Sequence, residues 1–208
     1  MSAGENAAWS RDLETEIIAL SAEAFLERKE AIVDVYRAAF SPPPYRKSEN
    51  EVRQFRGSLQ RHAGRQGFRC RLARQERGPL AGFAYGYTAR RGVWWYDVVS
   101  AQMDEEMKRE WLADPFELVE LAVRPERQGR GFGGRLHDAL LAGLPHSTAL
   151  LSTLDAETAA WHLYHHRGWR VLLDDFRFPN VSRPYVIMGL RLSDGEGESD
   201  TSPETVPR

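Results

Sequence analysis

The stretch 116-FELVELAVRPERQGRGFGGRLHDALL-141 decides how this chain of 208 residues folds. Its first eight residues are apolar except for Glu117 and Glu120, as expected of a central strand that helices cover on both faces. Leucines then recur at helical spacing and predict a helix from about Phe132 to Ala142. A glycine-rich loop connects the two elements, and its chemistry is the first indication of function.

This loop has the properties of an anion-binding site. Four arginines face one acid, Glu126, and they are Arg124, Arg127, Arg130 and Arg135. Glycines let backbone N–H groups approach a ligand closely. The first turn of the following helix leaves N–H groups unpaired, and its dipole adds partial positive charge. The loop therefore predicts a pyrophosphate site, the alternative being a turn that only serves packing.

Two ligand families use such a loop. Gly129, Gly131 and Gly134 fit the dinucleotide fingerprint G-x-G-x-x-G, and Asp155 stands about where a ribose-binding acid would. Against this interpretation, five residues separate the strand from the first glycine, the motif falls in mid-chain, and too few strands follow for a doubly wound sheet. The fingerprint alone is weak evidence for a nicotinamide-binding domain.

The same window contains Gln128-x-x-Gly131-x-Gly133. With its strand and helix, it resembles the acetyl-coenzyme A loop of the GNAT family of N-acetyltransferases. That family carries a second pattern one strand later, A-x-x-x-Y-x-x-x-G-F/W, which is matched here by AWHLYHHRGW from Ala160 to Trp169. The two motifs together, at the right separation, are far more specific than either alone.

The resemblance implies an α+β fold. Its mixed, mostly antiparallel central sheet would be flanked by helices, with acetyl-CoA in the split between two parallel strands, 116–123 and 148–154. Main-chain groups of Leu121, Ala122 and Val123 would lie along the pantetheine arm. The implied pyrophosphate-binding residues are Gln128, Gly129, Arg130, Gly131, Phe132, Gly133 and Gly134.

The resemblance also assigns catalytic roles. Tyr164 matches the usual general acid, because a phenol is protonated at neutral pH and can give its proton to a thiolate. Glu117 and Glu120 are candidates for the base, with Glu117 ranked first. Because side chains alternate along a strand, we expect the two carboxyl groups to point to opposite faces. Tyr164 as a core residue and Glu117 as a partner of a helix arginine are the structural alternatives.

The implied reaction is direct acetyl transfer to a primary amine of a small molecule, a peptide or a protein. The main alternative is a non-catalytic acyl-CoA-binding module of the same fold. Trp94, Trp95 and Tyr96 could line an acceptor pocket, and the SPPPY loop 41–45 and the loop 176–185 fall where the family builds its acceptor site. The chain departs from the family at Glu157, where many members have Asn, which puts that one coenzyme contact in doubt.

The flanking elements follow from shorter patterns. Ser21 is a helix cap for the apolar periodicity up to Phe40, and Ser48 with Glu51 forms a capping-box pattern. Segments 68–75 and 80–89 predict a hairpin, and 169–176 and 184–192 predict the last strands. Further expectations are a possible strand in GVWWYDVVS, a helix in the segment that follows it, and a helix over 156–167 capped by Asp155 and ended by Gly168.

Composition limits the remaining possibilities. We expect one domain over 13–192 between disordered ends, 1–12 and an acidic tail 193–208. The net charge of −2 disfavours nucleic-acid binding, and no apolar run is long enough for a membrane span. A lone Cys70 favours a reducing, cytoplasmic location. His162, His165 and His166 lack a further ligand at motif spacing, so no metal is expected, and the aromatic segment 93–96 could serve a homodimer.

Overall fold

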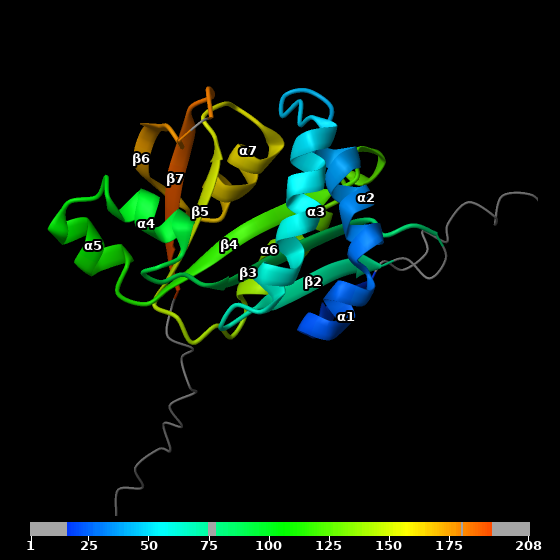
Figure 1. Cartoon of the computed structure of the whole chain (residues 1–208), viewed down its shortest axis with the longest axis horizontal. Helices are drawn as coiled ribbons and strands as arrows, with labels where there is room; N and C mark the ends of the chain where they lie inside the picture. The colour runs from blue at the N-terminus through cyan, green and yellow to red at the C-terminus, as the bar shows by residue number, and fades with distance from the viewer. Residues whose placement is uncertain (1–15, 75–77, 180, 193–208) are drawn as a thin grey trace, which may run out of the picture.

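The computed structural model describes residues 16–74, 78–179 and 181–192. A seven-stranded sheet in the order β1-β2-β3-β4-β5-β7-β6 forms its centre (Figure 1). The strands are β1 (Glu16–Leu20), β2 (Arg69–Arg74), β3 (Gly82–Thr88), β4 (Pro115–Val123), β5 (Thr148–Leu154), β6 (Arg170–Phe176) and β7 (Tyr185–Arg191). Each neighbouring pair is antiparallel except β4 and β5. The predicted fold class is confirmed.

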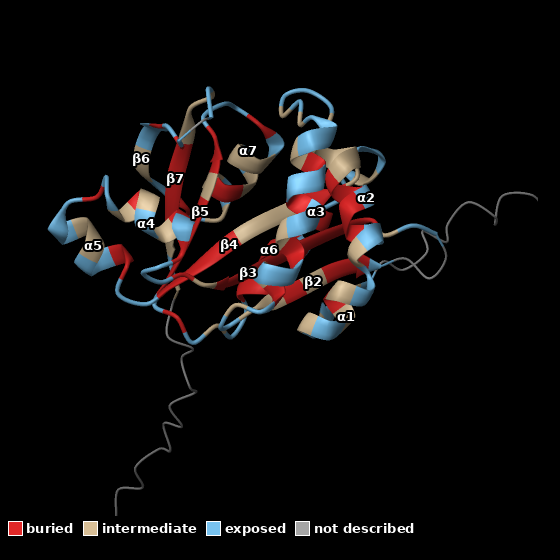
Figure 2. Ribbon diagram, in the orientation of Figure 1, coloured by how far each residue is buried: buried red, intermediate tan, exposed pale blue. Residues whose placement is uncertain are grey.

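Helices cover both faces of the sheet. They are α1 (Ala22–Glu27), α2 (Lys29–Phe40), α3 (Glu49–Ala63), α4 (Trp94–Ser100), α5 (Glu105–Trp111), α6 (Phe132–Leu141) and α7 (Ala159–His166), with a short 3-10 turn η1 (Pro125–Arg127). One apolar cluster joins α1–α3 to β2–β4, a second joins α4 and α5 to β5–β7, and a third joins α6 and α7 to the sheet. Buried residues line the sheet and the inner helix faces (Figure 2).

The N-terminal predictions are confirmed with two differences. Ser21 caps α1, and the capping box at Ser48 and Glu51 forms both of its hydrogen bonds. The periodicity that extends to Phe40 is divided between α1 and α2, which meet at Arg28. Strand β1 was not expected, because its five residues form a partly exposed edge strand with little apolar alternation. The predicted disordered ends lie outside the described residues.

Two local predictions are wrong. GVWWYDVVS is not a strand, because Trp95 and Val99 are buried one helical turn apart in α4 and their packing overrides the strand preference of β-branched and aromatic residues. Asp155 does not cap the helix that follows β5. The cap is Thr158, whose hydroxyl accepts a hydrogen bond from the Trp161 N–H at 3.1 Å, and α7 begins at Ala159. Gly168 takes the expected positive φ, at 77°.

The sheet opens between β4 and β5. The parallel ladder pairs Pro115, Phe116 and Glu117 with 148–150 and then ends, while β5 stays paired with β7 along its whole length. Along β4 the residues change from buried to partly exposed from Val119 to Leu121, as Figure 2 shows. Within the described part of the chain, main-chain groups of β4 beyond Glu117 therefore have no strand partner on the β5 side, as in the split that the resemblance implies.

A β-bulge in β4 sets where its acids point. Tyr87 pairs with Glu117, Gly86 with Leu118, and Tyr85 with Glu120, so Val119 is an extra residue. Residues directly opposite each other in a sheet share a face, and Tyr85 and Tyr87 are two apart on β3. Glu117 and Glu120 therefore lie on the same face, and the expectation of opposite faces is wrong.

Gly86 is the residue that permits this bulge. A Cβ at position 86 would collide with the Glu117 carbonyl oxygen and the Phe116 ring. We expect Gly86→Ala to lower the free energy of unfolding by about 1–3 kcal/mol, as measured by urea denaturation. Gly57→Ala is the matched control. Gly57 lies on the exposed face of α3, where a Cβ meets nothing within 4 Å, so this change should raise the free energy of unfolding by roughly 0.5–1 kcal/mol. Equal effects of the two changes would contradict this account.

Candidate active site

A groove of about 780 Å³ runs from the β4–β5 split to the glycine-rich loop. The end of β4, the glycine-rich loop, the start of α7 and the proline loop 42–45 line it. Of the ten residues predicted to bind coenzyme, nine line this groove: Leu121, Ala122, Val123, Gln128, Gly129, Gly131, Phe132, Gly133 and Gly134. The tenth, Arg130, is exposed and is not among the lining residues.

The loop presents backbone N–H groups to the groove. Gly129 and Gly131 adopt positive φ angles of 72° and 78°, a region that disfavours residues with a Cβ. Gly131 is the N-cap of α6, and no side chain caps that end of the helix. The first N–H groups of α6 are thus left for an anion, as the helix dipole favours. Gln128 instead braces the loop, because its Nε2 donates to the Val123 carbonyl at 3.0 Å.

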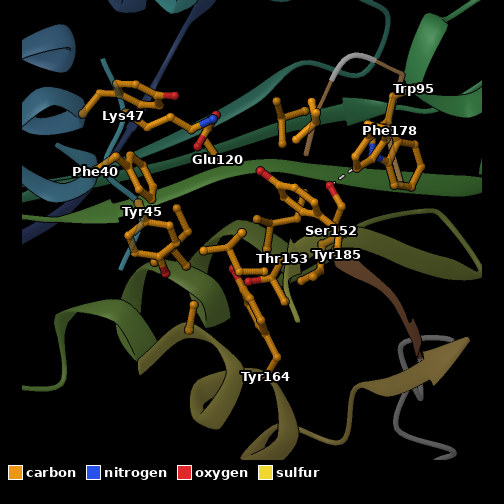
Figure 3. A pocket seen from close by; sticks show the side chains of 18 of the residues that line it. Phe40, Tyr45, Lys47, Trp95, Glu120, Ser152, Thr153, Tyr164, Phe178 and Tyr185 are labelled. Atoms are coloured by element: carbon orange, nitrogen blue, oxygen red, sulfur yellow. Dashed lines mark hydrogen bonds between the residues drawn. The ribbon is translucent and has the colours of Figure 1, made fainter. Parts of the chain in front are cut away.

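A second cavity, of about 270 Å³, adjoins the groove at the split. Phe40, Tyr45, Leu121 and Ala160 line both spaces, so the two are direct neighbours. Figure 3 shows the polar side chains of Lys47, Glu120, Ser152 and Tyr164 around this cavity. Carboxyl, ammonium and phenol groups thus meet beside the end of the groove.

The two predicted acids occupy different places on their common face. Glu120 is half-buried and lines the cavity, whereas Glu117 is buried and does not. Burial raises the pKa of Glu120 to about 8 against the opposing charge of Lys47. Burial also raises the pKa of Glu117 to about 8, opposed by Arg65 and by a hydrogen bond from Tyr87. Geometry therefore favours Glu120 over Glu117, the reverse of the sequence ranking.

Tyr164 projects from α7 toward the cavity, near Thr153 (Figure 3). It is 5% exposed, and burial raises its pKa well above that of a free tyrosine, so the phenol stays protonated. The rings of His137 and Trp169 lie 6.3 and 5.6 Å from its ring, between centroids. Main-chain N–H groups of Arg167 and Trp169 donate to the Tyr164 carbonyl.

A hydrogen-bond network, buried at Trp169 and His137 and exposed at Asp138, ties the end of α7 to the glycine-loop helix α6. Trp169 Nε1 donates to His137 Nε2 at 2.9 Å, so the remaining proton of a neutral His137 is on Nδ1, which lies 2.8 Å from Asp138 Oδ1. Asp138 also accepts two hydrogen bonds from Arg167 at 2.7 and 3.0 Å. The network fixes the helix that carries Tyr164 relative to the loop.

The cavity has two aromatic walls. One wall consists of Tyr36 and Phe40 from α2 and Tyr45 from the proline loop. The other consists of Trp94 at the start of α4, Phe178 in the loop between β6 and β7, and Tyr185 at the start of β7. The sequence indicated Tyr45, Trp94, Trp95, Tyr96 and both loops. Tyr96 is not among the lining residues, because its hydroxyl donates to the Leu112 carbonyl at 3.4 Å. The sequence missed Tyr36, Phe40 and Lys47. Tyr36 and Phe40 looked like core positions of a helix, and the only signal for Lys47 was that lysine is rare in this arginine-rich chain.

Two further residues lie in these spaces, Glu157 in the groove and Ser152 in the cavity. Glu157 lines the groove, where the carboxylate replaces the family's usual amide. Ser152 lines the cavity and accepts a hydrogen bond from Trp95 Nε1 at 3.2 Å. Within the described ranges, no three His, Cys, Asp or Glu side chains cluster as metal ligands would, and no helix has the length and apolarity of a membrane span.

Comparison of the sequence with known proteins identifies relatives. The sequence model of the acetyltransferase (GNAT) family matches residues 30–169. A GCN5-like protein acetyltransferase of Mycobacterium tuberculosis is 33% identical over 122 residues, which are 55% of this chain and 59% of the relative. The chain thus matches less than two thirds of that protein's length.

Solved structures share the fold at low sequence identity. A PaiA N-acetyltransferase from Thermoplasma acidophilum, in complex with coenzyme A, has a TM-score of 0.57 at 15% identity, over 86% of this chain and 99% of that one. YncA of Salmonella typhimurium, with acetyl-CoA, has a TM-score of 0.52 at 16% identity, over 93% and 99%. The likeness covers most of this chain and shows that the fold is shared.

Proposed function

This chain belongs to the GNAT family of acetyltransferases, and we propose that it transfers the acetyl group of acetyl-CoA directly to a primary amine. The observation that carries the proposal is the junction of the groove with the cavity, where Glu120 and Tyr164 line the same space beside the split strands. Both reactants can meet there without a covalent enzyme intermediate.

We assign the groove to acetyl-CoA. The N–H groups at the start of α6 and the glycines at 129 and 131 fit a diphosphate, which is the chemistry that such helix ends bind. The β4 main chain at Leu121 and Ala122 fits the amides of the pantetheine arm, which can pair with it as an added strand. Val123 is less available, because Gln128 already occupies its carbonyl. The two solved relatives with coenzyme bound support this assignment.

Glu120 acts as the general base. An amine attacks the thioester carbonyl only when its lone pair is free, so a proton must leave the nitrogen as the C–N bond forms. A carboxylate whose conjugate acid has a pKa near 8 is a stronger base than an ordinary glutamate, and it can take this proton once it is ionised. Glu117 is on the same face but outside the cavity, so it does not reach the amine, and the charge of Glu120 is one of the causes that raise the pKa of Glu117.

Tyr164 acts as the general acid. When the C–S bond breaks, the leaving thiolate takes the phenolic proton, which leaves the acetylated amine and the free thiol. An N–H of the β4 main chain near Leu121 stabilises the oxyanion, and such a donor contributes about 3 kcal/mol in other enzymes. The acid comes from α7 and the base from β4, so the two sit on opposite sides of the split.

A non-catalytic acyl-CoA-binding module is the competing function. It requires the groove but gives no reason for an acid of raised pKa and a protonated phenol to line a cavity at its end. Thiol release from acetyl-CoA over a panel of amines, measured beside coenzyme binding by calorimetry, separates the two functions. Binding without amine-dependent thiol release would favour the module.

The role of Glu120 predicts a pH dependence. Below a pH of about 8 its carboxyl group is protonated and cannot accept the amine proton, so kcat should fall as the pH is lowered through that value. Glu120→Gln should lower kcat by roughly 10²–10⁴-fold and remove this limb of the profile. Glu117→Gln should keep the limb, and the opposite pattern would transfer the role to Glu117.

The role of Tyr164 predicts a separation of turnover from binding. Tyr164→Phe keeps the ring and its packing against Trp169 but removes the proton donor. We expect kcat to fall by roughly 10²–10⁴-fold while the Kd of coenzyme A, measured by calorimetry, changes little. Unchanged turnover would remove Tyr164 from the mechanism.

A further inference from the structure

We propose that the acceptor is a small arylalkyl monoamine, a flat aromatic ring that carries one primary amine on a short chain. This inference rests on the proposed acetyl transfer and concerns the occupant of the cavity beside Glu120. Polyamines, aminoglycosides, amino acids and protein lysines are the competing acceptors. Three features of the cavity distinguish among them, namely its walls, its charges and the clasp that holds it.

The walls present aromatic surface from both sides. Trp94 is 58% exposed, yet its ring stacks on Phe178 at 5.6 Å between centroids and 29° between planes. Tyr185 packs edge-on against Phe178 at 5.3 Å. On the other side Phe40 contacts Tyr36 and Tyr45, with centroids 4.8 and 4.9 Å apart. A flat ring can stack or pack edge-on against such surfaces, which adds to the gain from apolar burial.

The charges suit one amine. Among the described residues that line the cavity, Glu120 is the single Asp or Glu, and Lys47 is the single Lys, Arg or His. Lys47 Nζ pairs with Glu51 at 2.9 Å. Burial lowers the pKa of Lys47, but this ion pair together with the nearby Tyr185 and Glu120 raises it overall. A polyamine or aminoglycoside would bring several positive charges to one carboxyl group. An amino acid would bring a carboxylate to an ammonium group that is already paired.

A clasp fixes the distance between the walls. Arg183 Nη1 donates to the carbonyl oxygens of Pro44 and Tyr45, both at 2.7 Å. This joins the proline loop of one wall to the loop that precedes Tyr185 in the other. The cavity is thereby held at about 270 Å³, a space for a small molecule with its own ring rather than for the surface of a folded protein.

Steady-state thiol release with four acceptors tests the proposal. They are 2-phenylethylamine, 2-cyclohexylethylamine, spermidine and a short lysine-containing peptide. The first two share the chain length and differ in whether the ring is flat, so a preference between them reports stacking rather than apolarity. We expect kcat/KM for 2-phenylethylamine to exceed that for the cyclohexyl analogue by roughly five- to tenfold, and to exceed those of the other two.

The variant Trp94→Leu tests whether the preference for the flat ring comes from the wall that contains Trp94. Trp94 is exposed, so its loss should not unfold the protein, and the variant should reduce the phenyl-over-cyclohexyl ratio to less than about twofold. Trp161→Leu is the matched control, because Trp161 lies on α7 outside both spaces and should leave the ratio unchanged. The KM for acetyl-CoA should stay unchanged in both variants.

A binding measurement separates this inference from the proposed transfer. Calorimetry of 2-phenylethylamine with the coenzyme A-saturated protein should show binding that Trp94→Leu weakens and Trp161→Leu does not. That result without turnover would refute acetyl transfer and still support the aromatic amine site. No binding at millimolar amine, a ratio near one in the unaltered protein, or faster turnover of spermidine or the peptide would each overturn the inference.

Discussion

The early end of the ladder between β4 and β5 is the constraint on which the site depends. Only 115–117 of β4 pair with β5, and the strands then diverge. The divergence leaves β4 main-chain groups without a strand partner, a cost that a sheet bears only where a ligand or another element can pair with them. The divergence also leaves a space in the sheet between the two groups of helices on one of its faces, α1–α3 and α4–α5, and the groove meets the cavity there.

The bulge at Val119 directs the carboxyl group of Glu120 into this opening. Without the extra residue, alternation would place Glu120 on the other face of the sheet from Glu117. With it, Glu120 faces the cavity and Glu117 lies buried on the same face, at a raised pKa. Keeping two acids in a poorly solvated place costs stability whenever they ionise, as is common at catalytic sites. Gly86 on β3 accommodates the bulge, so it helps to position Glu120 although it does not line the cavity itself.

The sequence predicted those parts of the fold that depend on local chemistry. Ser48 with Glu51, the glycine loop and the apolar periodicity of α6 each specify their structure within a few residues. It could not show the bulge, because nothing in FELVELAV distinguishes a regular strand from one with an extra residue. The error at Trp94–Ser100 has the same origin, since only packing against distant strands makes that segment helical. Tyr36, Phe40 and Lys47 converge on the cavity through tertiary contacts that no spacing encodes.

A crystal structure of this protein with coenzyme A bound tests the central claim most directly. The account predicts the diphosphate within hydrogen-bond distance of the N–H groups at the start of α6 and the pantetheine arm along the unpaired edge of β4. The thiol should then point at the Tyr164 hydroxyl, with Glu120 facing it across the cavity. Coenzyme bound elsewhere, or a thiol directed away from Tyr164 and the split, would contradict the account.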